Sequence, residues 1–107
     1  MIEFPYPPKI LSPNEKSWKK KIRPRKDYRK TCGWIAKKSR PFIKFKVHIH
    51  PPDKRNRDVD NAIGSCKSLI DGLQDAWGID DNNFIIDWPK EFSEPVKGGK
   101  ITIEGVL

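Results

Sequence analysis

Long apolar runs are absent from this 107-residue sequence, so no stretch is expected to span a lipid bilayer. A signal-peptide pattern is also absent, because Pro5, Pro7 and Pro8 stand where an apolar helix would be needed. Cysteine occurs only twice, and Cys32 and Cys66 fit neither a metal-ligand spacing nor a disulfide framework. We therefore expect a cytoplasmic protein with no membrane partner and with two reduced thiols in its core.

Positive charge is distributed unevenly along the chain, whose net charge is +8. Residues 1–57 hold 18 Lys and Arg against 4 Asp and Glu, a balance of +14, whereas residues 58–107 hold 4 against 10, a balance of −6. A basic segment can bind a polyanion by releasing counterions. Carboxylates near the same polyanion are explained by a divalent metal; the alternative is an acidic half that faces away from the ligand.

Two strands are predicted in the first half of the sequence. Residues 2–6 alternate weakly and form a short edge strand that Pro5 limits. Residues 41–50 give the clearest strand pattern, because apolar and mostly cationic residues alternate along them. The apolar positions are Ile43, Phe45, Val47 and Ile49.

The segment between these strands is predicted to form a basic helix. Ser12 can cap its start, Pro13 suits the first helical position, and Pro24 is expected to break or kink it. The apolar positions are Trp18 and Ile22, then Tyr28, Cys32, Ile35 and Ala36. Eight cations occupy other positions, and Lys19, Lys20 and Lys21 among them are candidate DNA-phosphate contacts. The alternative for this face is a solvated helix surface.

A second helix is predicted over residues 59–77. Asp58 stands at the N-cap position, and Gly78 is placed to end the helix. Asp60 and Lys67 fall on its polar side. The apolar residues recur with helical spacing, and they are Ala62, Ile63, Cys66, Leu69, Ile70, Leu73 and Trp77.

The last part of the sequence predicts a polar turn and two strands. The turn covers residues 80–83, a strand follows at 84–88, and a final strand covers 100–107 after a Gly-Gly turn. The order strand, helix, strand, helix, strand, strand is typical of an α+β domain. We predict one two-layer domain over residues 1–107, with a mixed sheet of about four strands packed against two helices.

Carboxylates flank the second predicted helix. Asp58 and Asp60 stand two residues apart where a loop becomes a helix, and the Asp80–Asp81 pair follows the helix. Three carboxylates suit one or two Mg²⁺ ions, which take oxygen ligands and can activate water for an in-line displacement. An EF-hand is excluded, because the twelfth position of a loop starting at Asp58 is Leu69 rather than Glu.

Cations lie on both sides of these carboxylates. Lys54, Arg55 and Arg57 can hold flanking phosphates, and Lys67 can stabilise charge on a phosphoryl group. Taken singly, each residue has a structural explanation: Asp58 as a helix cap, the Asp pair as a turn, and Lys67 as a solvated side chain. Their grouping favours a metal-dependent nuclease.

In combination, these motifs resemble the RusA family of Holliday junction resolvases, in its phage and prophage branch. The matching stretches are Arg57–Asn61, Lys67, Ile70–Leu73 and Ile79–Asp81, with Pro7–Pro8 and Leu11–Asn14 near the start and Lys97–Gly99 near the end. The resemblance covers most of the chain. Counted forward from Asn61, the family pattern would put its lysine at Gly64, so this chain differs by three residues inside the helix.

The resemblance implies a homodimer that cuts four-way DNA junctions symmetrically in recombination and repair, in a bacterial or phage-infected cell. It implies Mg²⁺, for which Mn²⁺ can substitute. The implied residues are Asp58, Asp60 and Asp81 as metal ligands and catalytic residues, Lys67 as the catalytic lysine, and Asn61 beside the basic loop as a DNA contact. Two alternatives stay open: a non-catalytic accessory protein that binds branched DNA, and a metal-dependent nuclease that acts on RNA or flaps.

Overall fold

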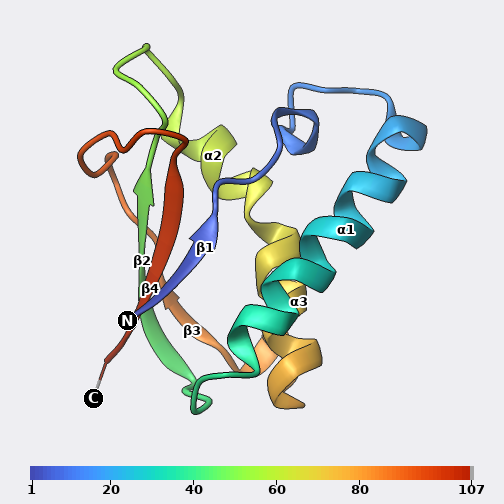
Figure 1. Cartoon of the computed structure of the whole chain (residues 1–107), viewed down its shortest axis with the longest axis vertical. Coiled ribbons are helices and arrows are strands. Elements are labelled where there is room, and N and C mark those ends of the chain that lie inside the picture. Colours follow the sequence, from blue (N-terminus) through green and yellow to red (C-terminus); the bar gives the residue numbers. More distant parts are fainter. Residues whose placement is uncertain (107) are drawn as a thin grey trace.

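Helices cover one face of a twisted four-stranded sheet in the computed structural model, which describes residues 1–106 (Figure 1). The strands are β1 (Ile2–Pro5), β2 (Lys44–His50), β3 (Ile85–Asp87) and β4 (Lys100–Gly105), in the spatial order β1-β4-β2-β3. β4 is antiparallel to β1 and β2, whereas β3 is parallel to β2. The predicted two-layer α+β fold with a mixed sheet is confirmed. Position 107, at the end of the last predicted strand, lies outside the described residues.

The apolar sides of β2 and β4 form the centre of the core. Phe45, Val47 and Ile49 are buried beside Ile101 and Ile103 of the neighbouring strand. Alternate residues of a strand point to opposite faces, so the apolar half of the pattern packs under the helices. The clearest predicted strand is confirmed, although it begins three residues later than expected.

The first helix begins later than predicted. α1 spans Trp18–Ala36, whereas Lys9–Leu11 form a short 3₁₀ turn, η1, that ends at Ser12. The prediction that Ser12 caps this helix is wrong, because its hydroxyl oxygen accepts a hydrogen bond from the backbone N–H of Asn14 in the turn. Pro24 lies inside α1, which continues through it despite the backbone hydrogen bond that proline removes.

Only the second half of α1 packs on the sheet as predicted. Tyr28, Cys32 and Ala36 are buried. Trp18 and Ile22, the apolar positions before Pro24, are 63% and 43% exposed and do not join the core. They are exposed because the start of α1 stands away from the sheet in the tertiary structure (Figure 1).

The second predicted helix is divided in two. α2 spans Val59–Ser65 and α3 spans Lys67–Trp77, and Cys66 joins them with φ −86° and ψ 0°. This break falls within the stretch where the chain differs by three residues from the RusA pattern. Gly78 ends α3 in the left-handed conformation with φ 65°, so the prediction of that helix end is confirmed.

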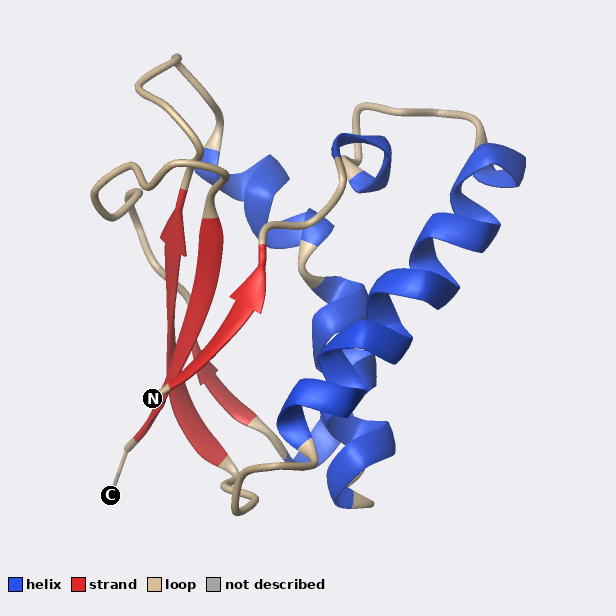
Figure 2. Cartoon of the chain, viewed as in Figure 1, coloured by secondary structure: helices blue, strands red, loops and turns tan. Residues whose placement is uncertain are grey.

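The helices form a single layer against the sheet (Figure 2). α1 and α3 pack side by side, and η2, a 3₁₀ turn at Asp81–Asn83, follows α3 and leads into β3. Among residues 1–106, none of the helices is both long enough and apolar enough to cross a lipid bilayer.

Candidate active site

A cleft of about 600 Å³ opens between the N-terminal segment and the loop that follows β2. One wall includes Tyr6, Lys9 and Ser12, and the other includes Arg55, Arg57, Asp58 and Asn61. The structure therefore brings together four of the residues predicted from the sequence. It places three cations and one carboxylate around a hollow that a phosphodiester group can enter.

Arg57 is held in a fixed position on this cleft. Its Nη1 donates to Oδ1 of Asp53 at 2.7 Å and to the backbone carbonyl of Asp53 at 3.1 Å. The hydrogen bond from Arg57, together with that from the backbone N–H of Arg55, holds the pKa of the Asp53 carboxyl below its usual value. Arg55 itself is exposed, with Nε 3.7 Å from Oδ2 of Asp53. One guanidinium is thus preorganised, and the other is free to follow a ligand.

Asp58 is the N-cap of α2, as predicted. Its Oδ1 accepts a hydrogen bond from the backbone N–H of Asp60 at 3.0 Å. Both side chains are exposed at the start of the helix. Capping uses one carboxylate oxygen of Asp58 and leaves the other available to a ligand.

Tyr6 and Lys9 belong to this cleft, and sequence reasoning did not select them. Burial raises the pKa of the Tyr6 hydroxyl, and the positive charge of Arg57 opposes that change in part. A Cβ at Gly99, where φ is 70°, would lie 2.8 Å from Cγ of Tyr6, so the Gly-Gly turn supports this wall from behind. The Pro7–Pro8 motif was the one sequence signal beside these residues.

Asp81 does not join Asp58 and Asp60 in one chain. β3 is parallel to β2 and pairs Ile85 with Lys44, so Asp81 lies near the start of β2. Asp58 follows the other end of β2, and Figure 1 shows α2 and the entry to β3 at opposite ends of the molecule. Within residues 1–106, no group of three His, Cys, Asp or Glu side chains is close enough to hold a metal ion.

The neighbouring acidic residue has a local role. Asp80 is the N-cap of η2, because its Oδ1 accepts from the backbone N–H of Asn82 at 3.0 Å. Asp81 lies in the first turn and is exposed; its backbone N–H donates to Oε1 of Gln74 at 3.3 Å. Within residues 1–106, capping uses one carboxylate oxygen of Asp80, whereas neither carboxylate oxygen of Asp81 has a hydrogen-bond partner.

Gly64, the position at which the RusA pattern would place a lysine, lies against Pro13. A Cβ at this position would lie 2.5 Å from Cγ of Pro13, so a larger residue has no room. Lys67 is exposed at the first position of α3, one turn further along. It does not line the cleft described above.

The remaining predicted DNA contacts fall into two groups. Lys54, Lys19 and Lys20 are exposed, the first in the basic loop and the others in the first turn of α1. Lys21 is only 6% exposed, and its Nζ donates to the backbone carbonyl of Ser12 at 2.9 Å. Lys21 therefore connects the turn after η1 to α1, and its side chain is not on the exposed surface where a DNA contact was predicted.

Comparison with known proteins adds a distant relative. No family model matches the chain. A protein described as uncharacterized from Xylella fastidiosa (strain Temecula1 / ATCC 700964) is 29% identical over 94 residues, which cover 78% of this chain. The chain spans 61% of the length of that relative. The similarity identifies a related sequence and assigns no activity.

Proposed function

We propose that this protein is a Mg²⁺-dependent DNA endonuclease that resolves four-way junctions as a homodimer, as its resemblance to the RusA family implies. The observation that supports this proposal is the cleft in which Arg55 and Arg57 stand beside Asp58. A nuclease needs cations to hold the phosphate backbone and carboxylates beside the bond that is cut. The cleft offers both on one wall and Lys9 on the other.

The donor set at the cleft suits magnesium. Mg²⁺ is usually bound through one or two carboxylates, with substrate phosphate and water completing its ligands. Asp58 lines the cleft, and Asp60 stands two residues later in the first turn of α2; both carboxylates are exposed. A Mg²⁺ ion bound there would lower the pKa of an attacking water and neutralise charge on the phosphate.

The cations of the cleft orient the substrate. Arg57 is already fixed by Asp53, so little side-chain freedom is lost when it donates to a phosphate oxygen. Arg55 and Lys9 contact the backbone from opposite walls and thereby hold the strand across the cleft. Lys67 remains the proposed catalytic lysine, on the helix that follows the carboxylates.

Asp81 serves the cleft of the partner subunit in this proposal. It lies at the opposite end of β2 from Asp58 of its own chain, and carboxylates that share a metal must converge on one ion. A two-fold homodimer resolves this conflict, because each chain can present its Asp81 to the other. The same symmetry matches a junction that is cut at two equivalent positions.

The test is cleavage of a labelled synthetic four-way junction in Mg²⁺ or in EDTA, beside a linear duplex. We expect paired symmetric cuts only with Mg²⁺ and only in the junction. Asp60→Asn should abolish cutting and leave junction binding intact or tighter, because it removes both a metal ligand and a charge that repels phosphate. Asp87→Asn, at an exposed position on β3 outside the cleft, is the matched control. Cutting in EDTA, or unchanged cutting by Asp60→Asn, would refute the proposal.

A non-catalytic accessory protein is the second candidate. The separation of Asp81 from the other two aspartates within one chain favours it, since three converging carboxylates are the stronger sign of a metal nuclease. Junction binding that is identical with Mg²⁺ and EDTA, and without cutting in either, would support this function.

A further inference from the structure

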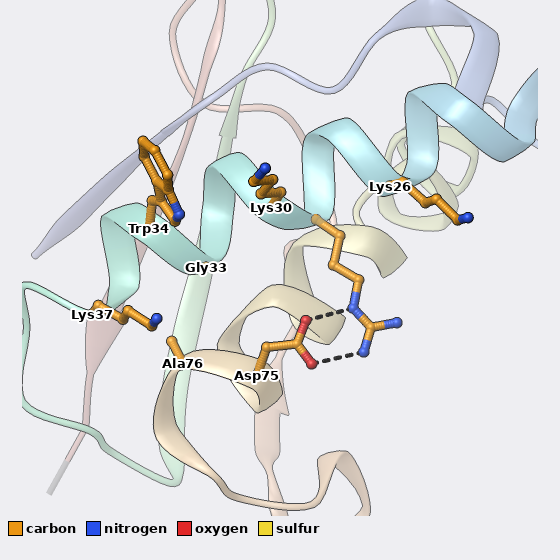
Figure 3. Close-up of a pocket in the computed structure, with 8 residues that line it drawn as sticks. Lys26, Lys30, Gly33, Trp34, Lys37, Asp75 and Ala76 are labelled. Atoms are coloured by element: carbon orange, nitrogen blue, oxygen red, sulfur yellow. Dashed lines mark hydrogen bonds and ion pairs between the residues drawn. The ribbon is translucent and has the colours of Figure 1, made fainter.

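A second cleft, of about 400 Å³, lies between α1 and α3 (Figure 3). The α1 side carries Lys26, Lys30, Trp34 and Lys37, and the α3 side carries Asp75 and Ala76. Lys26, Lys30 and Trp34 of α1 and its C-cap residue Lys37 follow one another at steps of four, four and three, so the four side chains form one stripe along the helix. Figure 3 shows Trp34 on α1 between Lys30 and Lys37.

Two glycines bring the helices close together at this point. A Cβ at Gly72 would lie 2.9 Å from the backbone nitrogen of Gly33, so neither helix can carry a larger residue there without moving. The cleft therefore has a backbone floor. Trp34 and the lysines project beyond this floor from α1, rather than filling the contact with α3.

The charges on the cleft are only partly compensated. Arg29 donates through Nε and Nη2 to the two carboxylate oxygens of Asp75, at 2.6 and 2.7 Å. This bidentate pair closes one side of the cleft and neutralises both groups. In the part of the chain that the structure describes, Lys26, Lys30 and Lys37 have no acidic partner. The stripe is thus positively charged.

Folding does not explain the exposure of Trp34. Its side chain is 66% exposed, whereas Nε1 of Trp77 donates to the backbone carbonyl of Ala36 and fixes that indole in the fold. Trp34 also borders a further hollow, of about 500 Å³, together with Lys37 and Lys38. An indole placed in solvent among unpaired cations provides a π-face beside charges that suit phosphates.

We propose that this stripe binds single-stranded DNA, with an unpaired base stacked on Trp34 and the neighbouring phosphates held by Lys30, Lys37 and Lys26. An intact duplex keeps its base faces stacked and would contact only the lysines. A second copy of this chain is a poorer occupant, because a two-fold contact would place the same cationic stripe against itself. The stripe spans about 16 Å, since the eleven steps between Lys26 and Lys37 each rise about 1.5 Å.

The probe is a fluorescein-labelled oligo-dT strand of about 12 nucleotides, measured by anisotropy in EDTA so that nothing is cut. An abasic strand of the same length carries the same charge without bases. We expect wild type to prefer oligo-dT, and Trp34→Ala to weaken oligo-dT binding by at least about fivefold, the lower end for one base–aromatic stack. Binding of the abasic strand should not change. Trp34→Phe should retain more of the affinity than Trp34→Ala.

Trp18→Ala is the matched control, because it removes the other exposed tryptophan of α1 without touching the cleft. Equal affinity for oligo-dT and the abasic strand would overturn the proposal, as would an equal loss in Trp18→Ala. So would a change of oligomeric state in Trp34→Ala by sedimentation, which would make Trp34 a subunit contact. Because alanine is a better helix former and the site is exposed, Trp34→Ala should fold; thermal melting verifies this. Strand binding in EDTA does not depend on junction cleavage, so this proposal and the endonuclease proposal can fail separately.

Discussion

Mixing two inactive variants, Asp60→Asn and Asp81→Asn, should restore junction cleavage if Asp81 acts on the cleft of the partner subunit. The prediction follows from the length of the elements that separate the two residues within a chain. β2 rises about 3.3 Å per residue, so its ends lie about 20 Å apart. α3, with 11 residues at about 1.5 Å each, spans about 16 Å along the other route. Oxygens that share a Mg²⁺ ion each lie about 2 Å from it, and no local relaxation closes this gap.

In a mixed dimer, one cleft would contain both substitutions and the other would contain neither. Random exchange makes half of the dimers mixed, so about a quarter of the wild-type number of clefts should be intact. Each mixed dimer has one working cleft, so the products should be single nicks rather than paired cuts. Junctions labelled on each strand and separated on denaturing gels distinguish the two.

The control is a mixture of Asp60→Asn with Asp58→Asn. Both substitutions affect the same wall, so every cleft in their mixed dimers lacks one carboxylate and should stay inactive. Two differently tagged subunits verify that mixed dimers have formed. No cleavage from verified dimers of Asp60→Asn with Asp81→Asn would refute the proposal that Asp81 acts on the partner.

Three further predictions concern the fold. Gly64→Ala should lower the free energy of unfolding by about 1–3 kcal/mol in urea denaturation, because the added methyl group would clash with Pro13. Adding Pro13→Ala to this variant should recover most of the lost stability. If the losses from the two substitutions simply add, the contact is contradicted. Lys21→Met should lower the free energy of unfolding by about 1–3 kcal/mol, because the hydrogen bond from Lys21 to the carbonyl of Ser12 is lost. Lys20→Met, at an exposed position, should change it by less than about 0.5 kcal/mol. Equal effects of the two substitutions would show that this hydrogen bond does not stabilise the fold. Burial raises the pKa of both cysteine thiols to about 12, so a thiol reagent at pH 8 should label them only as fast as the protein opens. Because folding raises the pKa of both thiols, the stability that they contribute is complete below the ordinary thiol pKa of about 8.5 and is lost as the pH rises toward 12. Rapid labelling of the folded protein would contradict the burial of the two thiols.

Local patterns predicted the elements whose causes are local. The period-two pattern of β2 identified its buried face, because each strand residue faces either the core or solvent. Asp58 and Gly78 were recognised as helix ends because a cap acts on backbone groups within a few residues. The exposure of Trp18 depends on how far α1 extends beyond the sheet, which the periodicity of the helix does not record.

The break between α2 and α3 was hidden for a similar reason. Cys66 is buried and falls in the apolar series, so the pattern of side chains continues across a change of backbone conformation. The packing of Pro13 on Gly64, which brings a distant segment against α2, leaves no periodic signal either.

The candidate site was predictable where its residues are neighbours in sequence. The stretch from Arg55 to Asp58 forms one wall of the cleft, and its composition alone indicated phosphate binding beside carboxylates. Tyr6 and Lys9 come from a segment about fifty residues away in the sequence. Only the tertiary fold places them across the cleft from Arg55 and Asp58. The position of Asp81 depends on β3 running parallel to β2, which the alternating pattern cannot distinguish from the antiparallel arrangement.

The contact between Pro13 and Gly64 sets a constraint on how this cleft can evolve. Pro13 follows the segment that carries Lys9, and Gly64 belongs to the helix that Asp58 begins, so this contact joins the two segments that form the walls. The two positions form a pair that must change together. Among related chains, those with a side chain at the position of Gly64 should lack the proline or carry a rebuilt N-terminal turn. Chains that keep both should share the break before α3.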